Sequence, residues 1–186
     1  MHIANQLKQR SIAEYLLYMW QTEDLIRAYG CDIDRIASEF IPQFSLDAAS
    51  RAELLDWYEG LVKMMSLENV KSGGHLQINK NVILRLVDLH QQLLRSPKHP
   101  EYGAEFYRTL PFIVELRAKA GAKAAGEIET CFNALYGVMV LRLKKQAVSE
   151  ATERATAQIS RFLAMLSAYY KENEEKPIFE DCENLN

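Results

Sequence analysis

Apolar residues recur at helical spacing along most of the chain. Between residues 6 and 29, Ile12, Leu16 and Met19 fall on one helix face, and Gly30 follows as a C-terminal cap. The β-branched residues are spaced by three and four positions instead of two, so no strand is indicated. Equivalent stripes predict further helices over residues 32–40, 50–70, 82–96, 101–121, 123–145 and 149–171.

Polar residues stand where several of these helices would begin. Ser50 and Glu53 have the spacing of a capping box, in which each side chain bonds to the backbone amide of the other. Pro42 and Pro97 follow two of the predicted helices, and proline ends a helix because its ring replaces the amide hydrogen. The candidate N-terminal caps are Asp32, Ser45 or Ser50, Asn79 or Asn81, and Ser149.

Two segments decide the number of helices and which of them is central. Pro111 lies inside residues 101–121, so that helix is either kinked there or divided into two, and we favour the division. Residues 123–145 are apolar nearly all round, which is typical of a helix enclosed by its neighbours. The sequence therefore predicts an all-α, single-domain bundle of about six to seven helices with this apolar helix at its centre.

Length and composition agree with one soluble domain. The chain has 186 residues, of which 48% are hydrophobic and 25% are charged, the usual balance of a globular protein. Its longest apolar uncharged run, residues 130–141, is twelve residues, well short of the roughly 18 to 20 that cross a bilayer. We therefore expect no membrane association.

Negative charge is concentrated at the C-terminus. Residues 172–186 carry a net charge of −5, and residues 1–171 carry +2. The near-neutral body lacks the basic excess that binding to a phosphate backbone demands, which disfavours a nucleic-acid partner. We expect residues 1–171 to form the helical domain and residues 172–186 to form a loose acidic tail.

The three cysteines, Cys31, Cys131 and Cys182, are far apart and none belongs to a Cys-x-x-Cys pair. Free thiols are typical of a reducing compartment, so a cytoplasmic location is expected. Cys131 sits among apolar residues, where a thiol is usually inert. The sequence contains no Glu-x-x-His pair and no Gly-rich phosphate loop, so we predict no metal, no cofactor and no catalytic residue.

Two segments resemble a known family. Residues 12–27 (IAEYLLYMWQxEDLIR) and 127–137 (EIExCFNALYG) are similar to an uncharacterised bacterial domain-of-unknown-function family of small helical cytoplasmic proteins. The resemblance covers nearly the whole chain, up to the acidic tail. It implies a bacterial cytoplasmic origin and brings no catalytic or binding residue to transfer.

Glu23 falls near the centre of the apolar stripe of the first predicted helix, between Met19 and Ile26. A buried carboxylate needs a partner, because an unpaired charge costs several kcal/mol inside a protein. Arg27, one turn further along, is the nearest candidate. The alternative is an ordinary pair between Glu23 and Arg27 on the helix surface.

Arg142 and His90 are also ionisable residues on the apolar faces of predicted helices. Arg142 falls on the same helix face as Leu135, and His90 falls on the same helix face as Leu86. Convergence of Glu23, His90 and Arg142 would form a ligand or active site between helices. For His90 the alternative is a core imidazole bonded to a backbone carbonyl. For Arg142 it is a structural ion pair or an extended stem that keeps the charge in water.

The first predicted helix carries more aromatic residues than one face can bury in a monomer, namely Tyr15, Tyr18, Trp20 and Tyr29. Large amphipathic rings suit a homodimer seam or a surface for another protein. Alternatively, the same rings pack under neighbouring helices.

Two functions are therefore open. The first is a non-enzymatic interaction or adaptor module that self-associates, most simply as a homodimer, through the aromatic first helix or the narrow apolar seam of the last helix. The alternative is a small-molecule-binding protein or enzyme with a pocket formed by Glu23, Arg27, His90 and Arg142.

Overall fold

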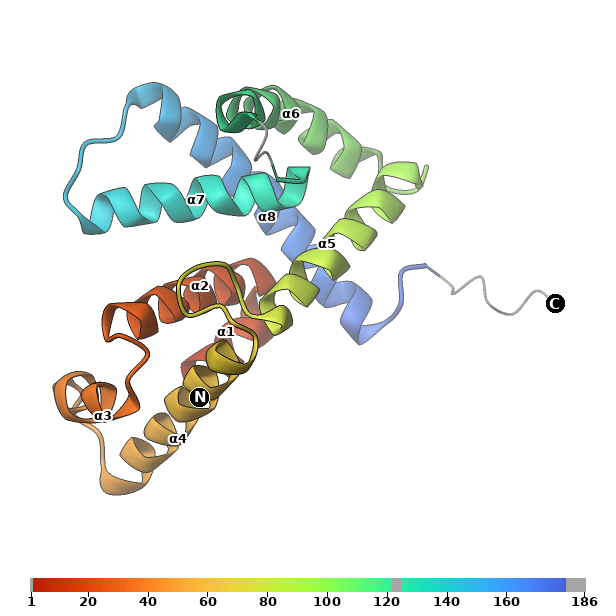
Figure 1. Cartoon of the computed structure of the whole chain (residues 1–186). Helices are drawn as coiled ribbons and strands as arrows, with labels where there is room; N and C mark the ends of the chain where they lie inside the picture. The colour runs from red at the N-terminus through yellow and green to blue at the C-terminus, as the bar shows by residue number, and fades with distance from the viewer. Residues whose placement is uncertain (1, 122–124, 180–186) are drawn as a thin grey trace. The chain divides into compact units, whose positions relative to one another are not determined.

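The computed structural model describes residues 2–121 and 125–179, and this part of the chain is helical without any strand (Figure 1). The all-α prediction is confirmed. The eight α-helices of these residues are α1 (His2–Arg10), α2 (Ile12–Ala28), α3 (Ile33–Arg35), α4 (Ala48–Leu67), α5 (Gln77–Arg95), α6 (Pro100–Ala120), α7 (Glu127–Leu143) and α8 (Glu150–Glu175). Between α3 and α4 lie a π-helical turn, η1 (Ile36–Phe40), and a 3-10 turn, η2 (Ile41–Gln43).

The described residues form eight helices instead of six to seven, because the first predicted helix is broken at Ser11 into α1 and α2. Asp32 caps α3 as predicted, and its carboxylate accepts hydrogen bonds from the amides of Asp34 and Arg35. The short α3 then passes directly into η1, so the second predicted helix exists but changes its hydrogen-bond pattern along its length.

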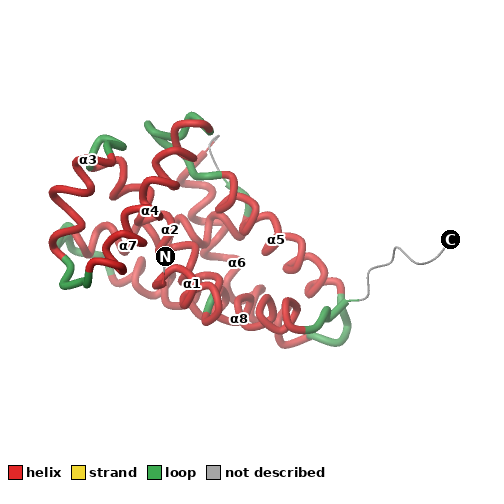
Figure 2. Tube along the Cα trace, turned by 90° about the horizontal axis from the view of Figure 1, so that it is seen from below, coloured by secondary structure: helices red, strands yellow, loops and turns green. Residues whose placement is uncertain are grey.

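The chain divides into two compact units. Unit 1 comprises Met1–Arg10 and Glu14–Val82, and unit 2 comprises Ser11–Ala13 and Ile83–Asn186. Helix α5 contributes to both units. Figure 2 shows that helices account for most of the described chain and that loops connect them.

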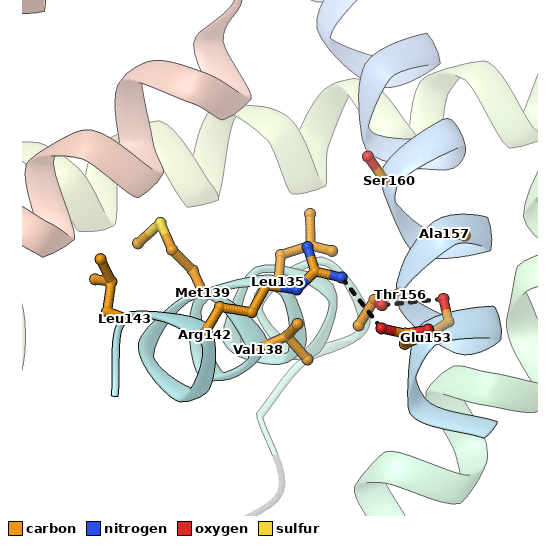
Figure 3. A pocket seen from close by; sticks show the side chains of 9 residues that line it. All are labelled: Leu135, Val138, Met139, Arg142, Leu143, Glu153, Thr156, Ala157 and Ser160. Atoms are coloured by element: carbon orange, nitrogen blue, oxygen red, sulfur yellow. Dashed lines mark hydrogen bonds and ion pairs between the residues drawn. The ribbon is translucent and has the colours of Figure 1, made fainter. Parts of the chain in front are cut away.

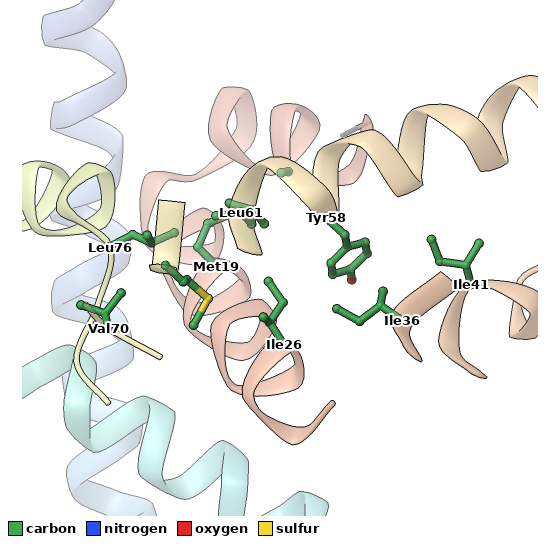
Figure 4. Packing of buried hydrophobic residues seen from close by; sticks show 10 residues of the cluster. Met19, Ile26, Ile36, Ile41, Tyr58, Leu61, Val70 and Leu76 are labelled. Carbon is green, nitrogen blue, oxygen red and sulfur yellow. The ribbon is translucent and has the colours of Figure 1, made fainter. Parts of the chain in front are cut away.

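A cluster of buried apolar side chains holds unit 1 together (Figure 4). Met19 and Ile26 come from α2, and Leu61 comes from α4. Ile36 of η1 and Ile41 of η2 join the same cluster. Because each fully buried aliphatic side chain contributes about 1.5–3 kcal/mol, this cluster fixes the two irregular turns against α2 and α4.

The N-terminal caps of α4 and α5 differ from the sequence prediction. Asp47 caps α4, and its carboxylate accepts a hydrogen bond from the amide of Ser50 at 2.7 Å. The capping box that begins at Ser50 and the alternative cap at Ser45 are therefore wrong. Asn79 lies inside α5, which begins at Gln77, and its side chain is fully buried.

In unit 2, helices α6, α7 and α8 pack on one another. Each contributes a buried ring, from Phe106, Phe132 and Phe162 respectively. Helix α6 continues through Pro111, so the division into two helices that we favoured is wrong. Pro111 is exposed, and the carbonyl of Tyr107, which loses its helical amide donor to the proline ring, can be hydrated there.

Helix α7 is not enclosed along its whole length. Ile128 and Cys131 are buried, whereas the side chain of Leu143 is 64% exposed. The apolar sequence of residues 123–145 therefore predicted more burial than α7 has. Among the described residues, no helix has the length and apolar character that a membrane span requires.

Helix α8 begins after the predicted cap, where Ser149 accepts a hydrogen bond from the amide of Thr152. It ends at Glu175, four residues into the segment that was expected to be a loose tail. Residues 180–186 of that segment lie outside the described part of the chain.

Candidate functional site

Unit 1 contains an apolar pocket of about 670 Å³, which we call the unit 1 pocket. Its volume falls within the range of small-molecule sites. Helices α1, α2 and α4 and the chain from η1 to α4 form its walls. Aliphatic lining comes from Ile3, Leu25, Leu46 and Leu54, and aromatic lining comes from Tyr18, Phe40, Phe44 and Tyr58.

The turns η1 and η2 place two of these rings. At the end of η1 the amide of Ile41 donates to the carbonyl of Ile36, five residues earlier, which is the π-helical pattern. The rings of Phe40 and Phe44 meet edge to face with centroids 5.0 Å apart, and Phe40 meets Tyr58 in the same way at 5.6 Å. Single π-helical turns are frequent at functional sites, so this departure from a regular helix marks the pocket.

The two tyrosine hydroxyls of the pocket are neutral at pH 7, and burial moves their pKa still further above that pH. Desolvation raises the pKa of Tyr18 above its usual value, and a hydrogen bond with Thr22 offsets part of that rise. The pKa of Tyr58 is raised further, by burial and by the proximity of Tyr18. A neutral phenol both donates and accepts hydrogen bonds, so each ring offers an apolar face and one polar handle.

The polar lining of the pocket contains no positively charged group. None of its twelve lining residues, all within the described chain, is a lysine, arginine or histidine. The four polar side chains are those of Gln21, Thr22, Ser50 and Glu53. This lining suits a neutral or cationic molecule with a mainly apolar surface, because an anion would find no opposite charge there.

Glu23 is fully buried on α2, as its place in the apolar stripe predicts. Its carboxylate lies 2.6 Å from Nδ1 of His75. It also accepts hydrogen bonds from the amide of Leu76 at 2.9 Å and from the side-chain amide of Asn79 at 2.7 Å. The His75 ring stacks on Trp20 with centroids 4.1 Å apart, which leaves its side chain 28% exposed.

Arg27, the expected partner of Glu23, forms its contacts elsewhere. Its guanidinium donates to the carbonyls of Val70, at 3.1 Å, and of Gly74. It also pairs with Asp24 at 2.7 Å. The expected pair is therefore not formed, and Glu23 and Arg27 instead hold the segment between α4 and α5 by separate sets of bonds.

His90 is a buried imidazole surrounded by aromatic rings of unit 2. Its Nδ1 lies 2.6 Å from the hydroxyl of Tyr102, and the rings of Phe106 and Phe162 approach it at 4.7 and 5.8 Å. Burial lowers the pKa of His90 to about 4. Its Nε2 lies 3.8 Å from the carboxylate of Glu127. His90 is thus a core imidazole, bonded to a tyrosine hydroxyl and not to the backbone carbonyl of the alternative interpretation.

Arg142 lines a groove of about 560 Å³ between α7 and α8 (Figure 3). Leu135 and Val138 form part of its apolar side, and the guanidinium reaches toward Glu153 on α8. The two charged groups are 3.8 Å apart, with side chains 64% and 55% exposed. Such an exposed pair corresponds to the ion-pair alternative and contributes about 0–1 kcal/mol.

His90 and Arg142 lie near opposite ends of α7. His90 approaches Glu127, the first residue of that helix, whereas Arg142 follows fifteen residues later. At 1.5 Å per residue the separation along the helix is about 22 Å, too far for both to hold one small molecule. Glu23 belongs to unit 1. Within unit 2, His90 and Arg142 therefore do not belong to one site, and of the three residues unit 1 contains Glu23 alone.

The aromatic residues of the first predicted helix are integrated into the packing of unit 1. Trp20 is buried, and Tyr15, Tyr18 and Tyr29 are half-buried. Tyr18 stacks with Trp57 of α4 at a centroid distance of 6.3 Å. These positions agree with the alternative in which the rings pack under neighbouring helices.

The described residues contain no candidate metal centre, and the thiol of Cys131 is not activated. No group of three His, Cys, Asp or Glu side chains there could hold a metal ion. Burial, with a smaller effect of Glu127, raises the pKa of the Cys131 thiol to about 12. At neutral pH Cys131 is therefore a thiol and a poor nucleophile.

The sequence did not single out Phe40, Phe44 or His75. The available signal for the two phenylalanines is their spacing of four residues around Pro42, which places two rings beside an irregular turn. For His75 there was none, because its partner Glu23 is 52 residues away in sequence.

Comparison with known proteins identifies a family to which the chain belongs. The family model described as Domain of unknown function (DUF4924) matches residues 1–177. This agrees with the resemblance to an uncharacterised family that residues 12–27 and 127–137 indicate. No curated protein and no solved structure matches the chain.

Proposed function

We propose that this chain, which belongs to the DUF4924 family, is a small-molecule-binding protein whose ligand occupies the unit 1 pocket. The single observation that carries the proposal is the concave apolar lining of this pocket, with a volume of about 670 Å³. Ligand sites are typically of this size, mostly apolar, and provided with a few polar groups that orient the ligand.

The lining restricts the chemistry of the ligand. Phe40, Phe44 and Tyr58 form an edge-to-face aromatic wall that favours a flat or cyclic apolar molecule. Glu53 and the neutral hydroxyl of Tyr18 can meet a donor on the ligand. The ligand is therefore a neutral or cationic, largely aromatic or alicyclic molecule, and anionic analogues bind more weakly.

This proposal places the pocket within unit 1 and not at Glu23, His90 and Arg142. Protein interaction through Tyr15, Tyr18, Trp20 and Tyr29 has less support, because these rings are already buried or half-buried. We also propose that the protein is bacterial and cytoplasmic. The family resemblance and the free thiols of Cys31 and Cys131 support this location.

Binding of Nile red, a neutral aromatic dye, tests the proposal. In the wild-type protein its emission should rise to saturation at one dye per chain, and the anionic dye anilinonaphthalene sulfonate should bind at least about tenfold more weakly. Leu54→Trp fills the pocket and should weaken Nile red binding by about tenfold or more. Native mass spectrometry of the gently purified protein would show any retained molecule as added mass.

Leu135→Trp is the matched control, because it places the same side chain in the groove between α7 and α8. It should leave Nile red binding unchanged. Phe44→Ser provides a second pocket variant, since Phe44 is 40% exposed and its loss should cost little stability. Absence of saturable dye binding, or equal binding by wild type and both pocket variants, would overturn the proposal.

A further inference from the structure

We propose that the exposed face of α6 is a self-association surface that pairs antiparallel with the same face of a second copy of this chain. The face consists of Ala104, Tyr107, Pro111, Val114 and Ala118, which we call the α6 stripe. All five residues are exposed, with Tyr107 at 66% and Val114 at 56%. The proposal concerns unit 2 and does not depend on the pocket of unit 1.

The spacing of the stripe is that of a helix–helix seam. Its members alternate by three and four residues, the pattern that keeps apolar side chains on the contact face of two paired helices. The opposite face of α6 already buries Phe106 and Ile113 inside unit 2. Helix α6 therefore has two apolar faces, whereas a surface helix that only covers a core needs one.

The charges beside the stripe identify a second copy as the occupant. Along one flank, α6 carries Glu101, Arg108, Glu115 and Lys119, so the signs alternate from the N-terminal to the C-terminal end. In an antiparallel pair centred near Pro111, Glu101 faces Lys119 of the second copy. Arg108 likewise faces Glu115, and symmetry repeats both contacts. In a parallel pair this flank would instead face the opposite flank of the second copy, so these four charges would not meet one another.

These charged side chains are accessible for such contacts. Arg108, Glu115 and Lys119 are 68%, 63% and 71% exposed, and Glu101 is 52% exposed. Arg108 bonds to Glu105 at 2.8 Å, and Glu115 bonds to Lys119 at 2.7 Å, within the same helix. The second copy would extend these local pairs into a longer network of alternating charge.

The apolar residues fit the same arrangement. Antiparallel pairing about Pro111 brings Tyr107 beside Val114 of the second copy, and Ala104 beside Ala118. Small residues at the two ends allow close approach of the helices, and tyrosine is enriched at protein interfaces. A single helix pair is a small interface, so we expect a weak dimer that forms with rising concentration.

Sedimentation velocity over a range of about 10 to 500 μM protein tests the proposal, since this range covers weak complexes. Wild-type protein should pass from monomer to dimer. Val114→Glu places a charge in the stripe and should abolish the dimer. Arg108→Glu and Glu115→Arg should each weaken it by about tenfold, because symmetry breaks two ion pairs at once.

The double variant Arg108→Glu with Glu115→Arg is the decisive measurement, because it restores opposite charges only in the antiparallel arrangement. Its dimer should recover toward the wild-type affinity. Arg154→Glu, an exposed charge on α8, is the control and should have no effect. Circular dichroism checks that each variant folds. A wild-type protein that stays monomeric, or a double variant as weak as the single ones, would overturn the proposal.

Discussion

The Glu23 carboxylate lies 2.6 Å from Nδ1 of His75, and this contact joins the middle of α2 to the segment that leads into α5. The amide of Leu76 and the side chain of Asn79 donate to the same carboxylate. Glu23 thus satisfies a backbone donor, a side-chain amide and an imidazole at once. The cost of burying its charge is offset by three short bonds, none of which an apolar residue could replace.

Replacement of Glu23 by alanine should therefore be strongly destabilising. Glu23→Ala leaves buried donors of Leu76 and Asn79 without an acceptor, which should lower the free energy of unfolding by about 3 kcal/mol or more. Urea denaturation at neutral pH measures this value. Glu14→Ala, which removes an exposed carboxylate on the same helix, should change it by less than about 0.5 kcal/mol. A loss below about 1 kcal/mol for Glu23→Ala would contradict the structural role.

The comparison between Glu23 and its partners shows what the sequence could predict. Helical periodicity is a local property, so it placed Glu23 on the buried stripe correctly. The choice between His75 and Arg27 as partner depends on how a loop some fifty residues away folds back, which no local pattern records. Asn79 was predicted as a helix cap because no local pattern indicates that its side chain bonds to Glu23, which is 56 residues away in sequence.

The unit 1 pocket escaped prediction for a different reason. Its wall depends on η1 and η2, where the hydrogen bonds shift from a π-helical to a 3-10 pattern within eight residues. Regular periodicity gives no signal for such a change. The sequence therefore predicted a helix over residues 32–40 but not the directions of Phe40 and Phe44, which decide the shape of the pocket.

Arg27 should control the order of the segment between α4 and α5. Arg27→Ala removes the donors to the carbonyls of Val70 and Gly74, so the amides of residues 70–76 should exchange hydrogen about tenfold faster. Hydrogen–deuterium exchange with mass spectrometry measures the change. Arg154→Ala, which removes an exposed pair on α8, should leave these peptides unchanged. Equal exchange in wild type and Arg27→Ala would contradict the holding role.

Arg142 should contribute little to stability or to ligand binding. Arg142→Ala breaks an exposed pair with Glu153 at 3.8 Å, so the free energy of unfolding should change by less than about 0.5 kcal/mol. Nile red binding should also stay unchanged, because Arg142 lies outside the unit 1 pocket. Dye titration and urea denaturation of the same preparation measure both quantities. A large loss of dye affinity would instead favour the groove between α7 and α8 as the binding site.

His90 should make the stability of the protein depend on pH. Burial lowers its pKa in the folded state to about 4, whereas the unfolded chain has the ordinary value of about 6.5. Between these values the unfolded chain binds a proton that the folded chain does not. The free energy of unfolding should therefore fall as the pH falls from about 6.5 to about 4, and the contribution of His90 levels off below that range.

His90→Phe should remove this part of the pH dependence, because phenylalanine does not titrate. The variant also leaves the Tyr102 hydroxyl without its bond to Nδ1, so it should be less stable than wild type at pH 7. Its loss of stability between pH 7 and pH 5, measured by urea denaturation, should nevertheless be smaller. Phe106→Leu, which alters a ring 4.7 Å from His90, should lower stability equally at both pH values. An unchanged pH slope in His90→Phe would show that groups other than His90 carry the dependence.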